Sequence, residues 1–400
     1  IPSATARKGP SALSTTRDAG PRIEETLSCQ SSNLDERKGG NSITPSFIST
    51  VQELSRILPL RESEQIGINT VAEVYPFRIP FFYASLMDRE NPLCPIRLQA
   101  VPSARELKAG GVSDPLGEST IGLTPSFLKR YPRRGVFLVS SECAMYCRFC
   151  NRKRAVGKGH VWEESSEETF RYLEKDKEIS EVILSGGDPL MLAPARFTQI
   201  LERLRSIKMI EIIRVSTRLP VVFPEGIRAE HVKALRKHAP IWLIIHINHP
   251  NEVTKEFVEV AGILRRAGAV LISQTVLLSR INDCPYILSA LFQRLVRLGI
   301  KPYYLFQLDD VAGAQHFKVG VKSGTAFVRS LRRDISGLCM PVYAVDITGG
   351  VGKVPLARDY IVKHRGTDLI LRNTAGKKGS YKDDGRQSRC NNCGFCFALT

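Results

Sequence analysis

No stretch of the 400-residue sequence approaches the roughly 18 consecutive apolar residues that a membrane-spanning helix needs, so we expect nothing to cross a bilayer. A secretory signal is also missing, because no apolar segment follows a basic start. No repeat of fixed length is evident. Hydrophobic residues make up 43% and charged residues 24% of the sequence, which excludes a fibrous or wholly disordered chain.

Acidic residues are scarce relative to basic ones. The sequence has 40 Asp and Glu against 57 Lys and Arg, and its formal net charge is +17. Such an excess suits nucleic acid, an acidic surface or several anionic ligands without choosing among them, and a basic solvated surface explains it equally well.

The cysteines are more informative. Cysteines at close spacing converge on one point, as metal ligands do, whereas the disulfides of a secreted framework are dispersed pairs. We therefore expect metal centres and a reducing compartment, the cytoplasm. Six of the ten cysteines lie in two such triplets, Cys143/Cys147/Cys150 and Cys390/Cys393/Cys396.

The chain divides by composition into four regions. Residues 1–42 are rich in Ser, Thr, Gly and charge and are interpreted as a flexible leader. Residues 43–134 contain helical pieces broken by prolines, which indicates an N-terminal helical layer. Residues 135–335 alternate short β-rich runs with amphipathic stretches, and residues 336–400 form a C-terminal extension that ends in the second cysteine triplet.

The alternating region predicts an α/β fold. Its β-rich runs are continuous apolar stretches, typical of strands buried on both faces, and helical crossovers enforce parallel pairing. Six such units fit a partial or complete parallel (βα)6-type barrel, with a doubly wound open sheet as the alternative. The expected strands are 135–141, 181–185, 210–216, 241–248, 269–277 and 301–307, and the expected helices are 163–174, 194–205, 228–237, 252–266 and 285–298.

In either fold, ligands gather at the C-terminal ends of the strands. Residues with distinctive chemistry stand at or near those ends in this sequence, and their coincidence is stronger evidence for a site than any one motif. They are Cys143, Gly186-Gly187-Asp188, Ser216-Thr217-Arg218, His246, Gln274 and Asp309.

The first cysteine triplet leaves one metal position open. A four-iron cluster or a structural zinc normally takes four protein ligands, so three thiolates with one free position indicate a catalytic arrangement. Nine basic residues and one acid lie between Lys129 and Lys158. This excess suits a pocket for anionic groups, and a solvated basic face is the alternative.

Together these motifs resemble those of the radical S-adenosylmethionine superfamily and, within it, lysine 2,3-aminomutase. The similarity runs in order from about residue 80 to residue 355. The matching stretches are Arg130-Tyr131-Pro132, the segment Cys143 to Arg152, Ser185-Gly186-Gly187-Asp188, His249-Pro250-Asn251-Glu252, Asn282-Asp283-Cys284 and Asp346 to Lys353.

The resemblance implies that Cys143, Cys147 and Cys150 hold a [4Fe–4S] cluster whose open iron binds S-adenosylmethionine. One electron from the cluster then cleaves the sulfonium to a 5′-deoxyadenosyl radical. Gly186, Gly187 and Asp188 should receive the methionyl amino end, because glycine lets backbone approach closely and a carboxylate can face an ammonium. His246 and Gln274 are also expected to bind cofactor.

The resemblance also assigns Lys353 as the residue that forms a Schiff base with pyridoxal 5′-phosphate. A phosphate-binding loop is the alternative for the surrounding glycines, but no Ser or Thr follows the lysine as in a Walker motif. Arg130, Tyr131 and Arg134 match residues that hold the phosphate and ring of this cofactor. Two guanidinium groups suit a dianionic phosphate.

Three further residues are expected to select the substrate. Arg152 matches the residue that binds the α-carboxylate of an amino acid, and Asp309 and Asp346 match aspartates that bind the side-chain ammonium of lysine. Two carboxylates in one pocket repel each other unless a cation lies between them. Because Asp310 follows Asp309 and Ile347 follows Asp346, arginine or another cationic amino acid stays open as the substrate.

The second triplet resembles a C-terminal zinc site. In the lysine enzyme, the fourth zinc ligand is a cysteine of the neighbouring subunit, at the position that Cys284 occupies here. The resemblance thus implies that Cys284, Cys390, Cys393 and Cys396 bind zinc across a homodimer or dimer of dimers, and an auxiliary iron–sulfur cluster is the alternative.

The sequence therefore predicts a radical, pyridoxal-dependent 2,3-aminomutase of L-lysine or a similar cationic amino acid. An electron donor such as flavodoxin or ferredoxin is implied. The alternatives are an arginine 2,3-aminomutase, an aminomutase that modifies a lysine of a translation factor and, from a different class, a zinc-ribbon nucleic-acid-binding protein. The last leaves Lys353 and the two aspartates without a role, so nucleic acid is not expected as a partner.

Overall fold

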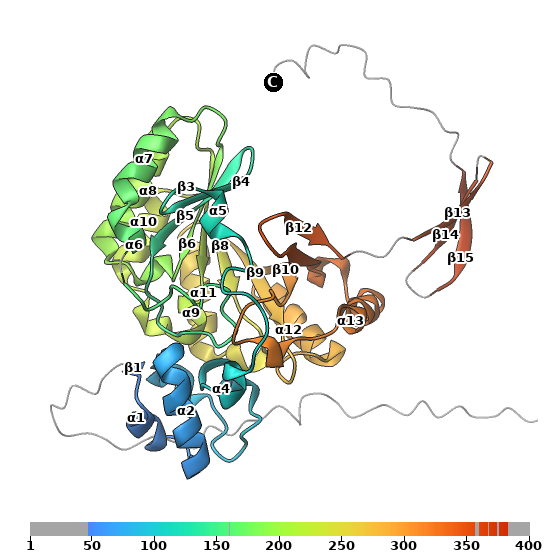
Figure 1. Cartoon of the computed structure of the whole chain (residues 1–400). Helices are drawn as coiled ribbons and strands as arrows, with labels where there is room; N and C mark the ends of the chain where they lie inside the picture. The colour runs from blue at the N-terminus through green and yellow to red at the C-terminus, as the bar shows by residue number, and fades with distance from the viewer. Residues whose placement is uncertain (1–46, 160, 357–359, 367, 374–375, 383–400) are drawn as a thin grey trace, which may run out of the picture. The chain divides into compact units, whose positions relative to one another are not determined.

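The computed structural model describes residues 47–159, 161–356, 360–366, 368–373 and 376–382 (Figure 1). Within these ranges the centre of the molecule is one ten-stranded sheet, in the order β12-β11-β10-β9-β8-β7-β6-β5-β4-β3. Neighbouring strands from β5 to β11 are parallel. They are β5 (Arg134–Ser140), β6 (Glu181–Gly186), β7 (Ile212–Thr217), β8 (Ile241–His246), β9 (Ala269–Leu277), β10 (Lys301–Gln307) and β11 (Val342–Ile347).

The two edges of the sheet are antiparallel. At one edge β3 (Gly122–Thr124) and β4 (Phe127–Tyr131) pair beside β5, and at the other edge β12 (Gly352–Pro355) pairs with β11. We expected helices and loops at 122–131, and the sequence analysis missed these strands because each is too short to show a period. Among the described residues the outermost strands β3 and β12 are not paired with each other, so the predicted partial barrel is confirmed and it stays open.

The helices that connect the parallel strands have clear end signals. Proline opens α8 and α12 at their first position, where its missing N–H has no intrahelical partner anyway. Thr254 caps α11, accepting a hydrogen bond from the backbone N–H of Phe257 at 3.1 Å, so this helix starts three residues later than we expected. The connecting helices are α6 (Val161–Glu164), α7 (Ser166–Lys175), α8 (Pro194–Ser206), α9 (Leu219–Val222), α10 (Ala229–Lys237), α11 (Lys255–Arg266), α12 (Pro285–Arg297) and α13 (Val321–Asp334).

The N-terminal layer is helical, as predicted, apart from a short antiparallel pair of β1 and β2. It contacts the loop that follows β5: the backbone N–H of Tyr146 donates to the carbonyl of Arg78, and that of Arg148 to the carbonyl of Gln99, each at 3.0 Å. Its elements are β1 (Phe47–Ile48), α1 (Val51–Ser55), α2 (Glu62–Val74), β2 (Ile79–Pro80), α3 (Phe81–Ser85), α4 (Pro95–Ala100) and α5 (Glu118–Ile121).

One hydrophobic core joins this layer to the barrel. It runs from Ile48 through the inner faces of the connecting helices to Tyr343. Fully burying a Leu, Ile or Phe side chain contributes roughly 1.5–3 kcal/mol, so this shared core fixes the N-terminal layer against the strand ends. Because the N-terminal layer and the barrel share this core, the layer holds the loops of the site in place.

The described part of the C-terminal extension contains a separate antiparallel sheet of β13 (Ile361–Arg365), β14 (Asp368–Arg372) and β15 (Lys378–Lys382). The leader 1–42 and the cysteines 390, 393 and 396 lie outside the described residues. None of the helices in the described ranges is long and apolar enough to cross a membrane.

Candidate active site

A cavity of about 370 Å³ lies at the C-terminal ends of the parallel strands. Its wall contains every residue that we predicted for the iron–sulfur, S-adenosylmethionine, pyridoxal and substrate sites. These are Arg130, Tyr131, Arg134, Cys143, Cys147, Cys150, Arg152, Gly186, Gly187, Asp188, His246, Gln274, Asp309, Asp346 and Lys353.

A buried cluster of charged side chains, Glu106, Arg148 and Lys153, holds the cysteine loop in place. Glu106, which is 2% exposed, accepts hydrogen bonds from Arg148 Nε at 3.0 Å, Arg148 Nη2 at 2.6 Å and Lys153 Nζ at 2.6 Å. Burial raises the pKa of Glu106, but the two cations outweigh it and the net pKa is lowered. Burial lowers the pKa of Lys153 to about 8. The sequence analysis missed Glu106, because its partners lie more than forty residues away along the chain.

Two thiols of the loop, those of Cys143 and Cys150, lie where burial opposes their ionisation. Burial, together with the nearby Asp188 carboxylate, raises the pKa of Cys143 well above its ordinary range, and burial raises the pKa of Cys150 to about 11. Buried thiolates need a compensating cation, which a bound iron–sulfur cluster would supply. The donor set therefore fits that group.

In the described ranges no three His, Cys, Asp or Glu side chains are grouped for a single metal ion. We had expected the first triplet to converge on one point. A [4Fe–4S] cluster does not require this, because each of its cysteines bonds to a different iron.

The segment after β6 is shaped by close backbone contacts. Gly186 has φ +111, and a Cβ atom there would lie 2.3 Å from the carbonyl oxygen of Ser140, so only glycine fits. The Asp188 carboxylate accepts hydrogen bonds from the Thr217 hydroxyl at 2.8 Å and from the Leu219 N–H at 2.9 Å. It also accepts from the backbone N–H groups of residues 190 and 218.

These hydrogen bonds fix the orientation of the Asp188 carboxylate, and its contact with an ammonium stays a prediction. Both of its oxygens accept hydrogen bonds from donors of the protein itself, and Asp188 also lines the cavity.

Side chains of β4 contact both β11 and β12 at the other edge of the sheet. The backbone N–H of Lys353 donates to the Tyr131 hydroxyl at 3.0 Å, and Arg130 Nη1 lies 3.2 Å from Asp346 Oδ1. Arg134 stacks over the Tyr131 ring with its guanidinium carbon 4.0 Å from the ring centroid. Arg130 Nε is buried without a partner among the described residues, which fits an anionic ligand such as a phosphate.

Lys353 stands where the hairpin of β11 and β12 brings it opposite Asp346. Its Nζ lies 2.7 Å from Asp346 Oδ2 and 4.3 Å from the centroid of the Phe306 ring, with the Tyr304 ring centroid at 5.3 Å. The glycines before Lys353 adopt positive φ angles, 85° at Gly349, which explains why the motif needs them. The two aromatic side chains of β10 near this Nζ, Tyr304 and Phe306, were not predicted.

The two adjacent aspartates after β10 have different environments. Asp309 lines the cavity and accepts a hydrogen bond from Asn151 Nδ2 at 3.1 Å. Burial, with the neighbouring Asp346 carboxylate, raises the pKa of Asp309 to about 6. Asp310 does not line the cavity and pairs with Lys318 at 2.8 Å. Asp310 was one reason why the sequence did not decide between lysine and arginine as the substrate. It is not part of the pocket.

Arg152 is held by a carboxylate that the sequence analysis missed. Its Nε donates to Glu118 Oε1 at 2.8 Å, and its Nη1 donates to the Ser185 hydroxyl at 3.1 Å. Burial raises the pKa of Glu118, but Arg152 and Arg154 outweigh it and the net pKa is lowered. Glu118 thus fixes the direction of the guanidinium in the cavity wall.

His246 and Gln274 lie side by side on β8 and β9. His246 Nε2 is 3.2 Å from Asn248 Oδ1, and burial lowers the pKa of His246 well below its ordinary value. The imidazole is therefore neutral at physiological pH and acts as a hydrogen-bonding group. Cys284 precedes α12, is partly exposed and does not line the cavity.

Comparisons with known proteins identify the family of this chain. The family model of the Radical SAM superfamily matches residues 137–278, and that named Lysine-2,3-aminomutase matches residues 328–398. The chain is 36% identical to L-lysine 2,3-aminomutase of Clostridium subterminale over 87% of this chain and 85% of that protein. It is 37% identical to L-lysine 2,3-aminomutase of Bacillus subtilis over 84% and 72%. It is 36% identical to glutamate 2,3-aminomutase of Clostridioides difficile over 84% and 81%.

A half-open barrel with three cysteines on the loop after its first parallel strand defines a radical S-adenosylmethionine enzyme. This class implies a [4Fe–4S] cluster and S-adenosylmethionine as cofactors. Within the class, the chain belongs to the lysine 2,3-aminomutase family. It is accordingly an isomerase of the kind that transfers an amino group within its substrate, and not the nucleic-acid-binding protein that the sequence left as an alternative.

Proposed function

We propose that this enzyme moves the α-amino group of L-lysine to carbon 3, using pyridoxal 5′-phosphate at Lys353. The observation that supports lysine as the substrate is the pair of carboxylates in one cavity, Asp309 and Asp346. Their mutual repulsion contributes to the raised pKa of Asp309, and a cation between them would relieve it. In the described structure Lys353 and Arg130 are paired with Asp346.

The other end of the substrate would meet Arg152. Arg152 lines the cavity and its guanidinium is held in place by Glu118, and a guanidinium forms charge-assisted hydrogen bonds to a carboxylate. An amino acid held at both ends has its carbons 2 and 3 fixed between them.

The proposed cofactors divide the chemistry. Bound pyridoxal phosphate would supply the π system that lets nitrogen pass between two carbons, and S-adenosylmethionine on the cluster would supply the radical that takes hydrogen from carbon 3. Arg130, Tyr131 and Arg134 would hold the phosphate and ring, and the rings of β10 would exclude water from Lys353. A one-electron donor of the flavodoxin or ferredoxin class would reduce the cluster.

Arginine is the second candidate substrate, since a guanidinium also fits two carboxylates. Glutamate is not a candidate, although one relative is a glutamate 2,3-aminomutase. A glutamate side chain would place a third carboxylate beside Asp309 and Asp346, in a cavity where one of these already resists ionisation.

The direct test is anaerobic reconstitution with iron, sulfide, pyridoxal phosphate and S-adenosylmethionine. The reduced protein is incubated with lysine, arginine or glutamate, and the β-isomers are separated by chromatography. We expect the β-isomer of lysine and none of glutamate. A β-isomer of glutamate as the main product would contradict the proposed pocket.

The raised pKa of Asp309 predicts a pH dependence. In the free enzyme this carboxyl is neutral below about pH 6 and charged above it, so kcat/KM for lysine should fall about tenfold per pH unit below pH 6. The stability effect has the opposite sign: the contribution of this group to folding is present below its unfolded pKa and is lost as the pH rises through about 6. Steady-state kinetics between pH 5 and pH 8 measure the first effect.

Two variants control this prediction. Asp309→Asn should remove the inflection near pH 6 and raise KM for lysine, since no charge remains to titrate. Asp310→Asn is the matched control, because Asp310 pairs with Lys318 outside the cavity and its loss should leave the profile unchanged. An inflection that persists in Asp309→Asn would assign it to another group.

We also propose that the C-terminal cysteines 390, 393 and 396 bind zinc together with Cys284 of a second copy of the chain. Three thiolates leave a tetrahedral zinc one ligand short, and Cys284 is free and partly exposed. Cys284→Ser should lower the zinc content and shift the assembly towards monomer in analytical ultracentrifugation. The iron content is the internal control and should not change. Unchanged zinc and an unchanged assembly would count against this site.

A further inference from the structure

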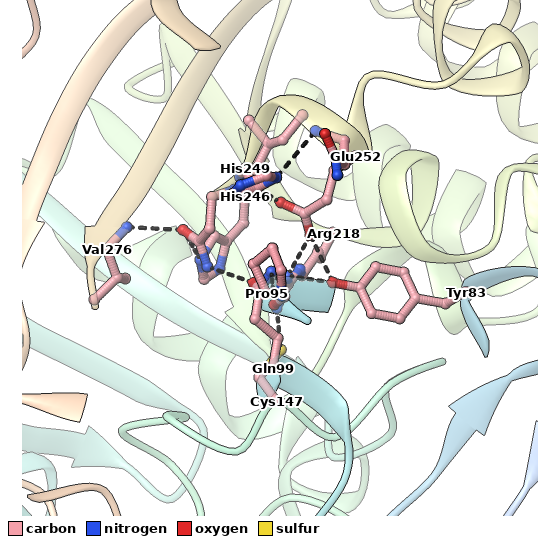
Figure 2. A network of polar contacts seen from close by, with 12 residues as sticks. Tyr83, Pro95, Gln99, Cys147, Arg218, His246, His249, Glu252 and Val276 are labelled. Atoms are coloured by element: carbon pink, nitrogen blue, oxygen red, sulfur yellow. Dashed lines mark hydrogen bonds and ion pairs between the residues drawn. The ribbon is translucent and has the colours of Figure 1, made fainter. Parts of the chain in front are cut away.

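An arginine that none of the predicted roles uses lies directly behind the cysteine loop. Arg218 follows β7, is 7% exposed and lines the cavity. Its Nη1 donates a hydrogen bond to Cys147 Sγ at 2.8 Å. Its Nη2 donates to Gln99 Oε1 at 2.6 Å and to Glu252 Oε1 at 2.7 Å (Figure 2). The guanidinium therefore joins a thiol of the loop to a buried carboxylate.

The carboxylate that holds this arginine is itself fixed. Glu252 is fully buried, and its Oε1 accepts a hydrogen bond from the Tyr83 hydroxyl at 2.8 Å. Its Oε2 accepts from the backbone N–H groups of Asn248 at 2.6 Å and His249 at 2.8 Å (Figure 2). A carboxylate with four donors, counting Arg218, cannot turn away from the arginine, so the N–H that points at Cys147 is held in one direction.

The side-chain amide of Gln99 locks the arginine from the other side. Its Oε1 accepts from Arg218 and also from Asn248 Nδ2 at 3.0 Å. Gln99 belongs to α4 of the N-terminal layer, while Asn248 follows β8 of the barrel. The position of the guanidinium is thus set by two parts of the chain that share one core, and not by a flexible surface contact.

A cation and an N–H group at a ligand sulfur have a defined effect on an iron–sulfur cluster. Reduction adds one negative charge to the cluster, and a nearby positive charge and hydrogen bonds to its sulfurs stabilise the reduced form more than the oxidised form. The effect is strong where water is excluded, because charges interact more strongly at low dielectric constant. The negative charge of Glu252 has the opposite effect on the reduced form, but it contacts Arg218 and not the sulfur.

We propose that Arg218 is a positioning residue that sets the reduction potential of the cluster through its hydrogen bond to Cys147, and that Glu252 limits how far the potential is raised. The inference rests on the proposed function, in that Cys147 must be a cluster ligand. It adds a residue that controls how readily an external one-electron donor can reduce the cluster.

The test is a potentiometric titration of the reconstituted enzyme, with the reduced cluster measured by electron paramagnetic resonance and iron and sulfide measured in each sample. Arg218→Gln should lower the equilibrium constant for reduction at least about tenfold at a fixed potential, which is a fall of about 59 mV for one electron. Glu252→Gln should shift the potential upwards by a smaller amount, since it removes the opposing charge.

Arg294→Gln is the matched control. Arg294 donates to the carbonyl of Pro250, two residues from Glu252, and has no hydrogen bond to a sulfur in the described structure, so its loss should leave the potential unchanged. Where Arg218→Gln does not assemble because Glu252 is left unpaired, the double variant Arg218→Gln/Glu252→Gln carries no unpaired charge. Its potential should lie below that of the wild type, since the arginine is the nearer charge.

The outcomes separate the two claims. A wild-type protein that takes up no cluster contradicts the proposed function. A wild type with a full cluster, and variants with full clusters at the same potential, overturns the role of Arg218 and leaves the proposed function standing. If both arginine variants fail to take up iron, Glu252→Gln decides, and a potential that does not rise overturns the inference.

Discussion

Replacement of Cys147 with alanine is expected to abolish the reductive cleavage of S-adenosylmethionine while the fold is kept. Cys147 lines the cavity at the strand ends between Cys143 and Cys150, and a four-iron cluster with one open position has no spare ligand to lose. The measurement is the yield of 5′-deoxyadenosine from the reduced, reconstituted protein. Far-ultraviolet circular dichroism reports whether the fold survives.

The control for this variant is Cys94→Ala. Cys94 is a free cysteine that precedes α4 and does not line the cavity, so its loss removes a thiol of the same N-terminal half of the chain without touching the loop. We expect this variant to keep its iron and to form 5′-deoxyadenosine. Cleavage that persists in Cys147→Ala at the wild-type rate would contradict the assignment of the first triplet.

The second large effect is expected for Lys353→Ala. The wild type should show a near-ultraviolet or violet absorbance with pyridoxal phosphate that borohydride reduction fixes to the chain. The variant should lose this reducible adduct, because the Nζ that faces Asp346 over the rings of β10 is then missing. Turnover of lysine should fall to background, while the iron content stays at the wild-type level.

Lys318→Ala is the matched control for this lysine. Its Nζ pairs with Asp310 outside the cavity, so the adduct should form as in the wild type. Mass spectrometry of the borohydride-treated protein locates the modified peptide. A modified peptide centred on a lysine other than Lys353 would place the pyridoxal site elsewhere.

Six of the seven parallel strands could be predicted from the sequence, because they stand out as apolar runs, whereas β11 was missed. The bounds of β9 and β10 match the expected ranges, and those of the other four expected strands differ by one or two residues. The short strands at the sheet edges were missed, since strands of three to five residues such as β3 and β12 show no period. Their pairing depends on neighbours that only the folded chain provides.

The residues of the cavity were predicted by motif, but their partners were not. Glu118 and Glu106 lie at positions where an acidic residue on its own carries no motif, and each finds its arginine 34 or 42 residues further along the chain. The carboxylate of Asp188 was expected to face a ligand, and in the structure it accepts hydrogen bonds from the turn at 217–219. Such pairings follow from tertiary packing and leave no trace in local spacing.

The most direct test of the account compares lysine with norleucine, which has the same carbon chain but lacks the ammonium group. Charge-assisted hydrogen bonds to a desolvated cation contribute roughly 1.5–3 kcal/mol each, which corresponds to about ten- to a hundredfold in selection. We expect the reconstituted enzyme to convert lysine to its β-isomer with a kcat/KM at least about tenfold above that for norleucine, and Asp309→Asn to reduce this preference. Equal kcat/KM values for the two amino acids would contradict the role of Asp309 and Asp346.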